Sequence, residues 1–380
     1  MSDQKLYIII KSPSGGAWVT ARETAQYWSA QGYDIEIISF LNDEIKDIQI
    51  SYHAVMFEKT NGKKLSRPIT ILYSLWLMVT WFLKSKPKNI MTVGLPISVP
   101  MMILRTIFFW IKTSQSILAD THITAHLNFK LKKNNSTTFR LMSMVTHNRF
   151  IYKFMMKNIA QVICLSQAMA DDLIYNYGLS KQKAYVIPPF INSDFFNYIL
   201  PSENPKNSIL YVGRLSDEKN IGDLLKAMTL VKKQNPDAKL TIIGDGEERE
   251  NLEKLAGENV TFKGRQYNVH EYHAAASCQV LTSHYEGFPL ALVEACANGV
   301  PMVSFDGPSG PRDAIIDGEN GFVVPQYDVP ALADAILKAL DTNWNRIEIR
   351  ESASRFKTEI VQQKYLKFIQ DLLDTQRQLS

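Results

Sequence analysis

Short apolar runs alternate with stretches of helical periodicity along the first half of the chain. A run that is apolar at every position indicates a strand covered on both faces. The first run, LYIII at residues 6–10, ends in the glycine-bearing turn SPSGGAW, and a helical stretch then reaches Ala30. Further strands are predicted at 33–40, 54–57, 89–93, 116–120, 161–166 and 184–187. This alternation predicts a parallel, doubly wound sheet, whose ligand sites lie beyond the carboxyl ends of its strands.

The same alternation starts again after LPSENPKNS at residues 200–208, a segment rich in proline, asparagine and serine. Strands are expected in the second half at 208–214, 239–246, 259–264, 278–283, 300–305 and 321–325. Helices are expected between them at 221–234, 247–256, 267–276 and 289–299. The predicted fold class is α/β, with two Rossmann-like doubly wound domains that face each other.

We predict a first Rossmann-like domain over residues 1–195, a linker at 196–207, a second Rossmann-like domain over 208–355 and a C-terminal helix within 356–380. The helical pattern from Phe356 to Leu373 is amphipathic and falls outside the alternation of strands and helices. It is therefore expected to pack elsewhere, with the first domain as the candidate partner.

Two longer apolar stretches, Ile69–Leu83 and Ile90–Ile111, raise the question of a membrane span, which needs about 20 apolar residues. The first is too short. A glycine, two prolines and Arg105 interrupt the second, which is predicted to be a strand, a turn and a helix. The N-terminus lacks the basic start and the cleavage site of a signal peptide, so its apolar run is interpreted as the first strand.

Charge is distributed unevenly along the chain. Residues 1–190 hold 22 Lys and Arg against 11 Asp and Glu, a net charge of +11, whereas the remainder holds 20 against 27, a net charge of −7. No nucleic-acid-binding motif accompanies the basic half. Aromatic side chains among the cations predict instead a surface that touches anionic lipid, and so a cytoplasmic protein peripheral on the inner face of the cytoplasmic membrane. The residues concerned are Trp76, Trp81, Trp110 and the basic runs at 84–88 and 130–133.

The three cysteines are far apart and show no CxxC or Cys/His spacing. This pattern argues against a disulfide framework and a zinc site. No DxD motif occurs either, so the sequence offers no obvious ligand set for a metal-held diphosphate. We predict no metal site and no cofactor.

The strongest local signal is HYEGFPLALVEACANGVP at residues 284–301. Pro289 is expected at the first helical position, and the free amides around Leu290 and Ala291 suit a diphosphate, because a helix start favours anions. The Glu294 carboxylate can accept hydrogen bonds from two vicinal ribose hydroxyls, and Glu286, earlier in the loop, would reach the donor sugar. Glu294 alone would be interpreted as a solvated surface residue, but its company of Gly287, Phe288 and Pro289 reverses that interpretation.

A second signal is YVGRLSDEKNIGDLL at residues 211–225, where Arg214 and Lys219 flank a polar turn between a strand and a helix. Two cations in that place can hold a diphosphate and stabilise the charge that builds on a departing nucleoside diphosphate. Without a metal, these cations must neutralise the leaving group.

The segments GRLSDEKN, EGFPLALVE and DGENGFVVP resemble glycosyltransferase family 4, the retaining enzymes of the GT-B fold. The resemblance is strong from about residue 208 to 345 and weaker in the first half, where SGGAW, ADTH, VICLSQAMADDL and VIPPFIN follow in the expected order. It implies donor binding by the second domain, acceptor binding by the first, and metal-free catalysis in a deep cleft between them with retention of anomeric configuration.

The resemblance also assigns roles to individual residues. It implies that Gly15 and Gly16 let the backbone approach the donor phosphates, that Arg265 lies near the nucleobase, and that His122 is the active-site histidine. Ile123 stands where an acidic residue often follows, and His126 is a competitor for this role. The donor-binding residues implied as a set are Gly15, Gly16, Arg214, Lys219, Arg265, Glu286, Gly287, Phe288, Pro289, Leu290 and Glu294.

The predicted function is transfer of a hexose or N-acetylhexosamine from a nucleotide diphosphate sugar, with UDP preferred to GDP, to a glycan or lipid-linked glycan. The segment FDGPSGPRDAIIDGENG at 305–321 is similar to family members that act on bacterial surface glycans. Three alternatives remain open: a non-hydrolysing nucleotide-sugar epimerase of the same fold, a catalytically silent binding protein on the membrane surface, and a nicotinamide-dependent oxidoreductase. The last is disfavoured because Arg249 stands where the third glycine of GxGxxG would be.

Overall fold

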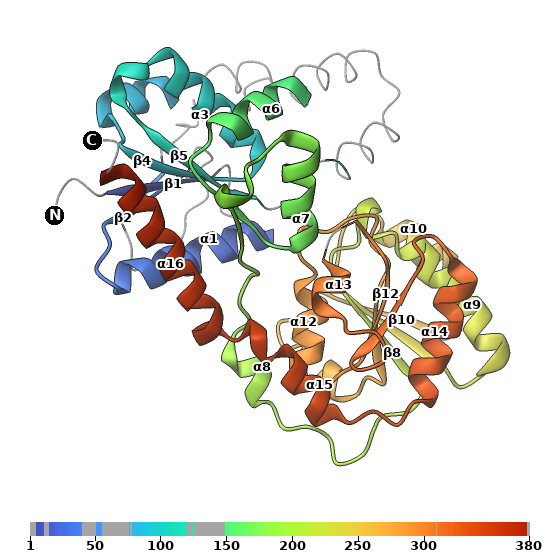
Figure 1. Ribbon diagram of the computed structural model, residues 1–380. Helices are drawn as coiled ribbons and strands as arrows, with labels where there is room; N and C mark the ends of the chain where they lie inside the picture. The colour runs from blue at the N-terminus through green and yellow to red at the C-terminus, as the bar shows by residue number, and fades with distance from the viewer. Residues whose placement is uncertain are drawn as a thin grey trace, which may run out of the picture.

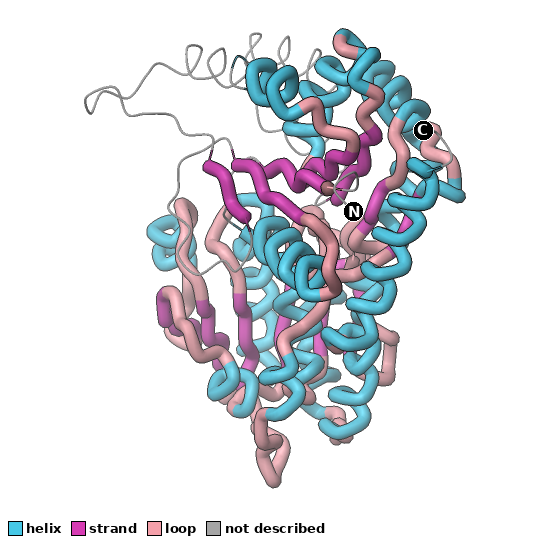
Figure 2. The backbone as a smooth tube through the Cα atoms, turned by 90° about the vertical axis from the view of Figure 1, so that its left-hand side faces the viewer, coloured by secondary structure: helices cyan, strands magenta, loops and turns pink. Residues whose placement is uncertain are grey.

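The chain folds into two parallel β-sheets, each covered by helices, as a computed structural model shows (Figures 1 and 2). The structure describes residues 5–10, 15–39, 51–54, 76, 78–119, 124, 149–308 and 310–377. The first sheet has the order β3-β2-β1-β4-β5-β6-β7, and the second has the order β10-β9-β8-β11-β12-β13. Every pairing between neighbouring strands is parallel. The predicted α/β class with two Rossmann-like domains is confirmed.

The first sheet follows the predicted apolar runs closely. Its strands are β1 Leu6–Ile10, β2 Ile35–Ser39, β3 Ser51–Ala54, β4 Asn89–Val93, β5 Ser114–Ala119, β6 Val162–Cys164 and β7 Ala184–Val186. Only β3 departs from the prediction, because it occupies 51–54, whereas the expected run at 54–57 extends beyond the described residues. Among the described residues β3 is the edge strand and pairs with β2 alone, so its segment SYHA does not need the continuous apolar pattern of a central strand.

The helices of the first domain include α1 Gly15–Ala30, α3 Leu95–Ile107, α6 Arg149–Asn158, α7 Gln167–Asp171 and α8 Ser193–Asn197. A π-helical turn, η2 Asp172–Asn176, and two short 3-10 turns, η1 Phe109–Ile111 and η3 Lys181–Lys183, complete the helical segments for which the structure gives bounds. The stretch at 90–111 is therefore a strand, a turn and a helix, as predicted. Gly94, with φ 81°, makes the turn, a conformation that favours glycine. No helix among the described residues is long and apolar enough to cross a membrane.

The second sheet contains β8 Ser208–Val212, β9 Lys239–Ile243, β10 Val260–Gly264, β11 Cys278–Leu281, β12 Met302–Phe305 and β13 Gly321–Val324. The four predicted helices are found as α9 Ile221–Gln234, α10 Arg249–Leu255, α11 His270–Ala274 and α12 Leu290–Ala297. Three further helices lie beyond the predicted set: α13 Pro311–Ala314, α14 Val329–Asp341 and α15 Arg346–Ser352.

The last helix, α16 Thr358–Arg377, runs back from the second domain and lies along α1 of the first (Figure 1). Trp28 of α1 is fully buried there, donates its indole N–H to the carbonyl of Tyr365 at 3.1 Å and stacks on Phe368. One apolar core contains these residues together with Phe356 and with Leu292 of α12. The two domains are therefore joined by continuous packing, and not by a linker alone.

Candidate active site

The loop that carries Arg214 follows the carboxyl end of β8 and packs directly on the loop after β9. The amide of Leu215 donates to the carbonyl of Asp245 at 2.9 Å. A Cβ added to Gly244 would lie 1.8 Å from the carbonyl oxygen of Gly213, and Gly244 has φ +138°. Glycine is thus required at 244 both for conformation and for space. The two glycines of the segment GDG, Gly244 and Gly246, let these two loops pack together. Their presence in a pattern like GxGxxG therefore has a structural reason and does not require a nicotinamide cofactor.

Gly244→Ala is expected to lower the free energy of unfolding by about 2–4 kcal/mol, because the strained φ and the clash with Gly213 add. The matched control is Gly222→Ala in α9, where an added Cβ meets nothing within 4 Å and alanine is the better helix former by up to about 1 kcal/mol. Thermal melting of the three proteins measures both effects. Equal melting temperatures for the two variants would contradict the account of the loop packing.

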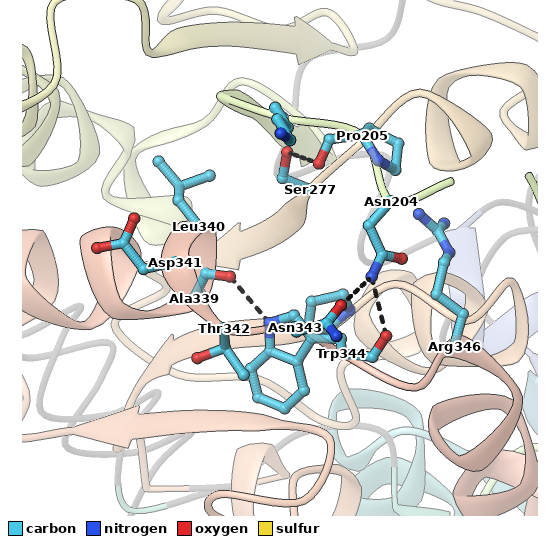
Figure 3. Close-up of a pocket in the computed structure, with 12 residues that line it drawn as sticks. Asn204, Pro205, Ser277, Ala339, Leu340, Asp341, Thr342, Asn343, Trp344 and Arg346 are labelled. Atoms are coloured by element: carbon cyan, nitrogen blue, oxygen red, sulfur yellow. Dashed lines mark hydrogen bonds between the residues drawn. The ribbon is translucent and has the colours of Figure 1, made fainter. Parts of the chain in front are cut away.

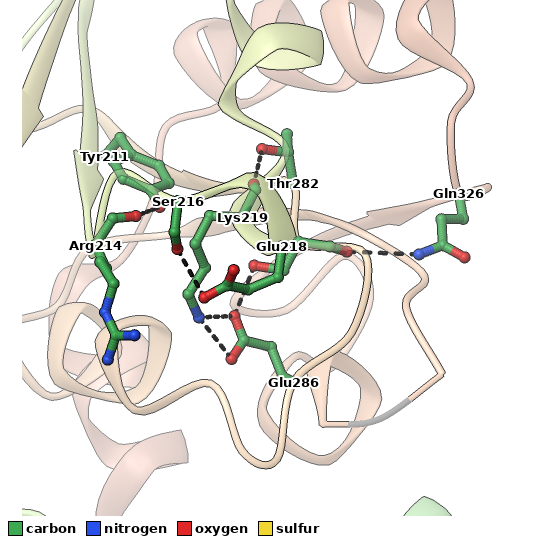
Figure 4. Close-up of polar contacts among 9 residues, drawn as sticks. Tyr211, Arg214, Ser216, Glu218, Lys219, Thr282, Glu286 and Gln326 are labelled. Carbon is green, nitrogen blue, oxygen red and sulfur yellow. Dashed lines mark hydrogen bonds and ion pairs between the residues drawn. The ribbon is translucent and has the colours of Figure 1, made fainter. Parts of the chain in front are cut away.

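The structure brings Lys219 and Glu286 together (Figure 4). The Lys219 Nζ lies 2.7 Å and 2.9 Å from the two carboxylate oxygens of Glu286. Ser283 donates its hydroxyl to the same carboxylate at 2.6 Å. The side chains of Lys219 and Glu286 are 22% and 11% exposed, so this ion pair is partly shielded from water. One cation and one anion of the predicted site therefore neutralise each other.

Two hydrogen bonds join the backbone of Glu218 and Lys219 to the loop after β11. Lys219 lies at the end of a 3-10 turn, η4 Asp217–Lys219. The amide of His284 donates to the carbonyl of Glu218 at 2.8 Å. The Thr282 hydroxyl donates to the carbonyl of Lys219 at 3.1 Å (Figure 4). Because β8 and β11 are neighbours in the sheet, their two loops meet at its carboxyl edge. Arg214 is exposed at the same edge.

The start of α12 differs in one respect from the prediction. The helix begins at Leu290, and Pro289, with φ −82° and ψ 69°, is its N-cap and not its first helical residue. These angles make an inverse γ-turn, in which the amide of Leu290 donates to the carbonyl of Phe288 at 2.9 Å. The expectation of a free amide at Leu290 was therefore wrong. Among the described residues, no acceptor is found for the amide of Ala291, which stays available at the helix start.

Glu294 lies in the second turn of α12 and is partly buried. Loss of hydration in this apolar environment raises the pKa of the Glu294 carboxyl to about 7. Within the described part of the chain, no group donates a hydrogen bond to its carboxylate; the contacts from Asn298 go to the Glu294 carbonyl. An acceptor in this state is suited to ligand hydroxyls, because their hydrogen bonds would compensate the lost hydration.

Because the pKa of Glu294 is raised, its contribution to stability is fully present below about pH 4.5 and is lost as the pH rises through about 7. We expect Glu294→Gln to remove this loss and to be more stable than the parent at pH 8 by on the order of 1–2 kcal/mol, with the difference vanishing near pH 5. Melting temperatures across this range measure it. Glu258→Gln is the control, since that carboxylate is 97% exposed; a control variant with the same pH profile as Glu294→Gln would contradict the assignment.

The other predicted residues fall into four groups. Arg265 is exposed after β10, with its guanidinium 5.8 Å from the ring of Tyr267. Gly287 follows Glu286 in the loop after β11, and Phe288 is buried. Gly15 and Gly16 are the first two residues of α1. His122 and His126 lie outside the described residues, so the choice between them stays a prediction.

Sequence reasoning missed the side chains that position the ion pair. Ser283 and Thr282 contact Glu286 and the Lys219 backbone, and Ser216 donates its hydroxyl to Glu218 at 2.7 Å. Gly310 was also missed: it has φ +91°, and an added Cβ would lie 2.4 Å from Cδ of Pro289. The only available signal was their position in loops after strands, where ligand sites of this fold occur.

A cavity of about 190 Å³ lies at the opposite edge of the second sheet (Figure 3). Its wall includes Ser277, which precedes β11, and Arg346, whose guanidinium donates to the carbonyls of Ala276 and His273. Both carbonyls belong to the end of α11 and the residues that follow it, so Arg346 caps a helix terminus there. The amino ends of the strands are not where doubly wound sheets bind ligands, and we do not assign this cavity to the donor.

Family models match both halves of the chain. One described as "Glycosyltransferase Family 4" matches residues 14–195, and one described as "Glycosyl transferases group 1" matches residues 193–359. The chain belongs to the glycosyltransferases of family 4 and group 1. The resemblance stated from the sequence is therefore confirmed.

Two curated relatives and one solved structure show what this chain is similar to. It is 25% identical over 344 residues to the poly(glycerol-phosphate) alpha-glucosyltransferase of Bacillus subtilis, across 86% of this chain and 46% of that protein. It is 27% identical over 334 residues to the amylovoran biosynthesis glycosyltransferase AmsD of Erwinia amylovora, across 84% and 85%. The chain spans about half the length of the Bacillus relative and of several others. The structure of Anabaena HepE in complex with UDP-glucose superposes with a TM-score of 0.73 at 17% identity, over 96% of this chain and 99% of that one, which shows a shared fold.

Proposed function

We propose that the chain is a retaining, metal-independent glycosyltransferase that moves a hexose or N-acetylhexosamine from a UDP-sugar to a glycan or glycolipid acceptor. The observation that carries this proposal is the partly shielded pair of Lys219 and Glu286 at the carboxyl edge of the second sheet, beside exposed Arg214. The pair supports the proposal because it offers one cation to the diphosphate and one carboxylate to the sugar, within one hydrogen bond of each other.

In the proposed reaction, the bond between the sugar C1 and the β-phosphate oxygen breaks, and the electron pair goes to the departing UDP. The acceptor hydroxyl forms the new bond to C1 on the same face and gives its proton to the departing β-phosphate oxygen. Lys219 transfers its contacts from Glu286 to the diphosphate oxygens, and Arg214 adds a planar fork for phosphate. Glu286, released from the lysine, accepts a hydrogen bond from a hydroxyl of the sugar. Charge on the leaving group is then stabilised most in the transition state.

The nucleotide is held, in this proposal, by three features of the second domain. Glu294 accepts hydrogen bonds from the ribose hydroxyls, and the amide of Ala291 at the start of α12 faces the diphosphate. Arg265 and the exposed ring of Tyr267 provide a surface for the base. The complex of HepE with UDP-glucose, a protein of the same fold, supports the choice of UDP.

The acceptor is proposed to be a bacterial surface polysaccharide, a lipopolysaccharide or a related cell-envelope glycan, assembled at the inner face of the cytoplasmic membrane. Two relatives support it by their names, which refer to poly(glycerol phosphate) and to amylovoran biosynthesis. No nucleic-acid partner and no cofactor enter the proposal.

Incubation with labelled UDP-sugars in the presence of EDTA, with lipid-linked and polymeric acceptors, tests this function. Transfer of label with retained configuration is the expected result, and free UDP should raise the melting temperature. Formation of an epimer of the donor would support an epimerase instead. Melting that no nucleotide changes would contradict the proposed donor site.

A further inference from the structure

Helix α6 has two apolar sides, of which one is buried and the other is not. Tyr152, Met155 and Met156 are buried against the first domain. Phe150 and Phe154 retain 81% and 52% of their surface exposed. Residues four apart lie on the same side of a helix, so the two phenyl rings form one row. An exposed apolar row bordered by polar groups is typical of a contact with a membrane or another protein.

Three cations share the exposed side of α6 with the phenyl rings. Arg149, Lys153 and Lys157 are exposed and follow one another at intervals of four residues. The helix contains no acidic residue. We call the five residues Arg149, Phe150, Lys153, Phe154 and Lys157 the α6 face. A helix that carries phenyl rings next to a row of cations has the composition of a helix that lies in a membrane interface.

Helix α3 extends this surface. The Arg105 guanidinium donates to the carbonyl of Asn158 at the end of α6, at 2.7 Å, which joins the two helices. Ile103 and Ile107, again four residues apart, are 47% and 56% exposed, and Trp110 in η1 is 60% exposed. Both helices lie on the side of the first domain that is far from the second domain (Figure 1).

The charged residues in the part of the sequence that contains these helices are almost all positive, up to Asp171 and Asp172, which follow it. From residue 59 to residue 170 the sequence contains 16 Lys and Arg and a single acidic residue, Asp120. In the described segments 78–119 and 149–170 there is no Asp or Glu at all. Such a surface is complementary to a partner of high negative charge.

We propose that the α6 face is a docking surface for an anionic lipid membrane, with the phenyl rings at the boundary of headgroups and acyl chains and the cations against the lipid phosphates. A soluble polyanion would satisfy the cations but would leave the rings in water, so the composition of the face favours lipid. This docking surface adds to the proposed function, in which the acceptor is assembled at the inner face of the cytoplasmic membrane. It rests on that proposed function only for the membrane-bound acceptor.

Of the aromatic residues named from the sequence for this purpose, Trp81 does not belong to the surface. It is partly buried and packs edge-to-face on Tyr7, with ring centroids 5.3 Å apart. Trp76 and Trp110 are 57% and 60% exposed and stay candidates. The basic run at 130–133 lies outside the described residues.

Co-sedimentation of the full chain with vesicles of phosphatidylcholine, alone or mixed with phosphatidylglycerol, tests the proposal. A basic residue near an anionic surface contributes about fivefold to partitioning, so Lys153→Gln/Lys157→Gln should weaken binding to the mixed vesicles by about tenfold or more. Phe150→Ser/Phe154→Ser should also weaken it by about tenfold. The matched controls are Lys233→Gln/Lys254→Gln and Leu255→Ser/Ile347→Ser, exposed residues of the second domain that should leave binding unchanged.

Three outcomes would overturn the proposal: equal binding to both kinds of vesicle, parent-like binding by the phenylalanine variant, or equal weakening by the controls. Heparin binding separates a lipid from a soluble polyanion, because the phenylalanine variant should bind heparin as the parent does and yet lose vesicles. Stabilisation by UDP, measured by melting, should be the same in all variants. This readout reports folding and the donor site, so failure of the docking surface is distinguishable from failure of the proposed function.

Discussion

Lys219→Ala is expected to lower kcat by about 100- to 1,000-fold and to change KM much less, by analogy with the loss of one preorganised donor to a developing anion. Lys219 lies at the carboxyl edge of the second sheet, and its Nζ is 2.7 Å from the Glu286 carboxylate. In the proposed reaction it exchanges this partner for the diphosphate. In the ground state its charge is already balanced by Glu286. In the transition state it would balance the departing diphosphate, so its removal affects turnover more than binding.

This experiment needs a control, because alanine at 219 also leaves the Glu286 carboxylate, 11% exposed, without its cation. An uncompensated, partly buried charge destabilises the fold by itself. The double variant Lys219→Ala/Glu286→Gln removes both charges and should recover the melting temperature without recovering kcat. Steady-state kinetics are measured with EDTA and again with magnesium. Full activity of Lys219→Ala, or parent activity that EDTA abolishes, would refute the proposed charge balance.

Glu286→Gln is expected to reduce kcat/KM for the UDP-sugar by about 10- to 100-fold, the usual value of about 1.5–3 kcal/mol for a hydrogen bond to a charged group. Glutamine keeps the shape of the side chain and can still accept from Ser283, whose hydroxyl lies 2.6 Å from the carboxylate. The affinity for free UDP should stay the same or rise, because Lys219 loses its competing partner.

Calorimetric titration with UDP, beside kinetics with the UDP-sugar, measures the two effects separately. Glu294→Ala is the comparison, since its carboxylate is assigned to the ribose and should be needed for free UDP as well as for the sugar donor. Equal loss of UDP affinity in the Glu286 and Glu294 variants would show that the two glutamates do not divide the donor between them.

The elements of the fold were largely predictable because apolar periodicity and helix starts are local signals. Helix α9 was expected at 221–234 and occupies Ile221–Gln234, with Leu224, Leu225 and Val231 buried along one side. Helix α14 was not predicted, although its start carries a clear signal: the Asp328 side chain accepts from the amide of Ala331 at 2.9 Å, and a proline occupies the first turn.

The pairing within the site could not be predicted in the same way. Lys219 and Glu286 were each singled out, but they are 67 residues apart, and only the order of the strands, with β8 beside β11, brings their loops together. The inverse γ-turn at Pro289 depends on a backbone angle that the segment GFPLAL does not specify. Sequence therefore identified the charged groups, and the three-dimensional fold determined which of them meet.

The return of α16 to the first domain has a consequence for engineering by recombination. The chain crosses between the domains twice, and the crossings are hydrogen-bonded to each other, since the Ile191 amide donates to the Phe356 carbonyl at 2.9 Å and the Thr358 hydroxyl to the Ile191 carbonyl at 3.1 Å. A chimera that joins the first half of this gene to the second half of another would receive a foreign α16 against Trp28. Exchanging donor specificity therefore requires two junctions, one near 197 and one near 357, so that the final helix is inherited with the half of the gene that encodes its binding surface.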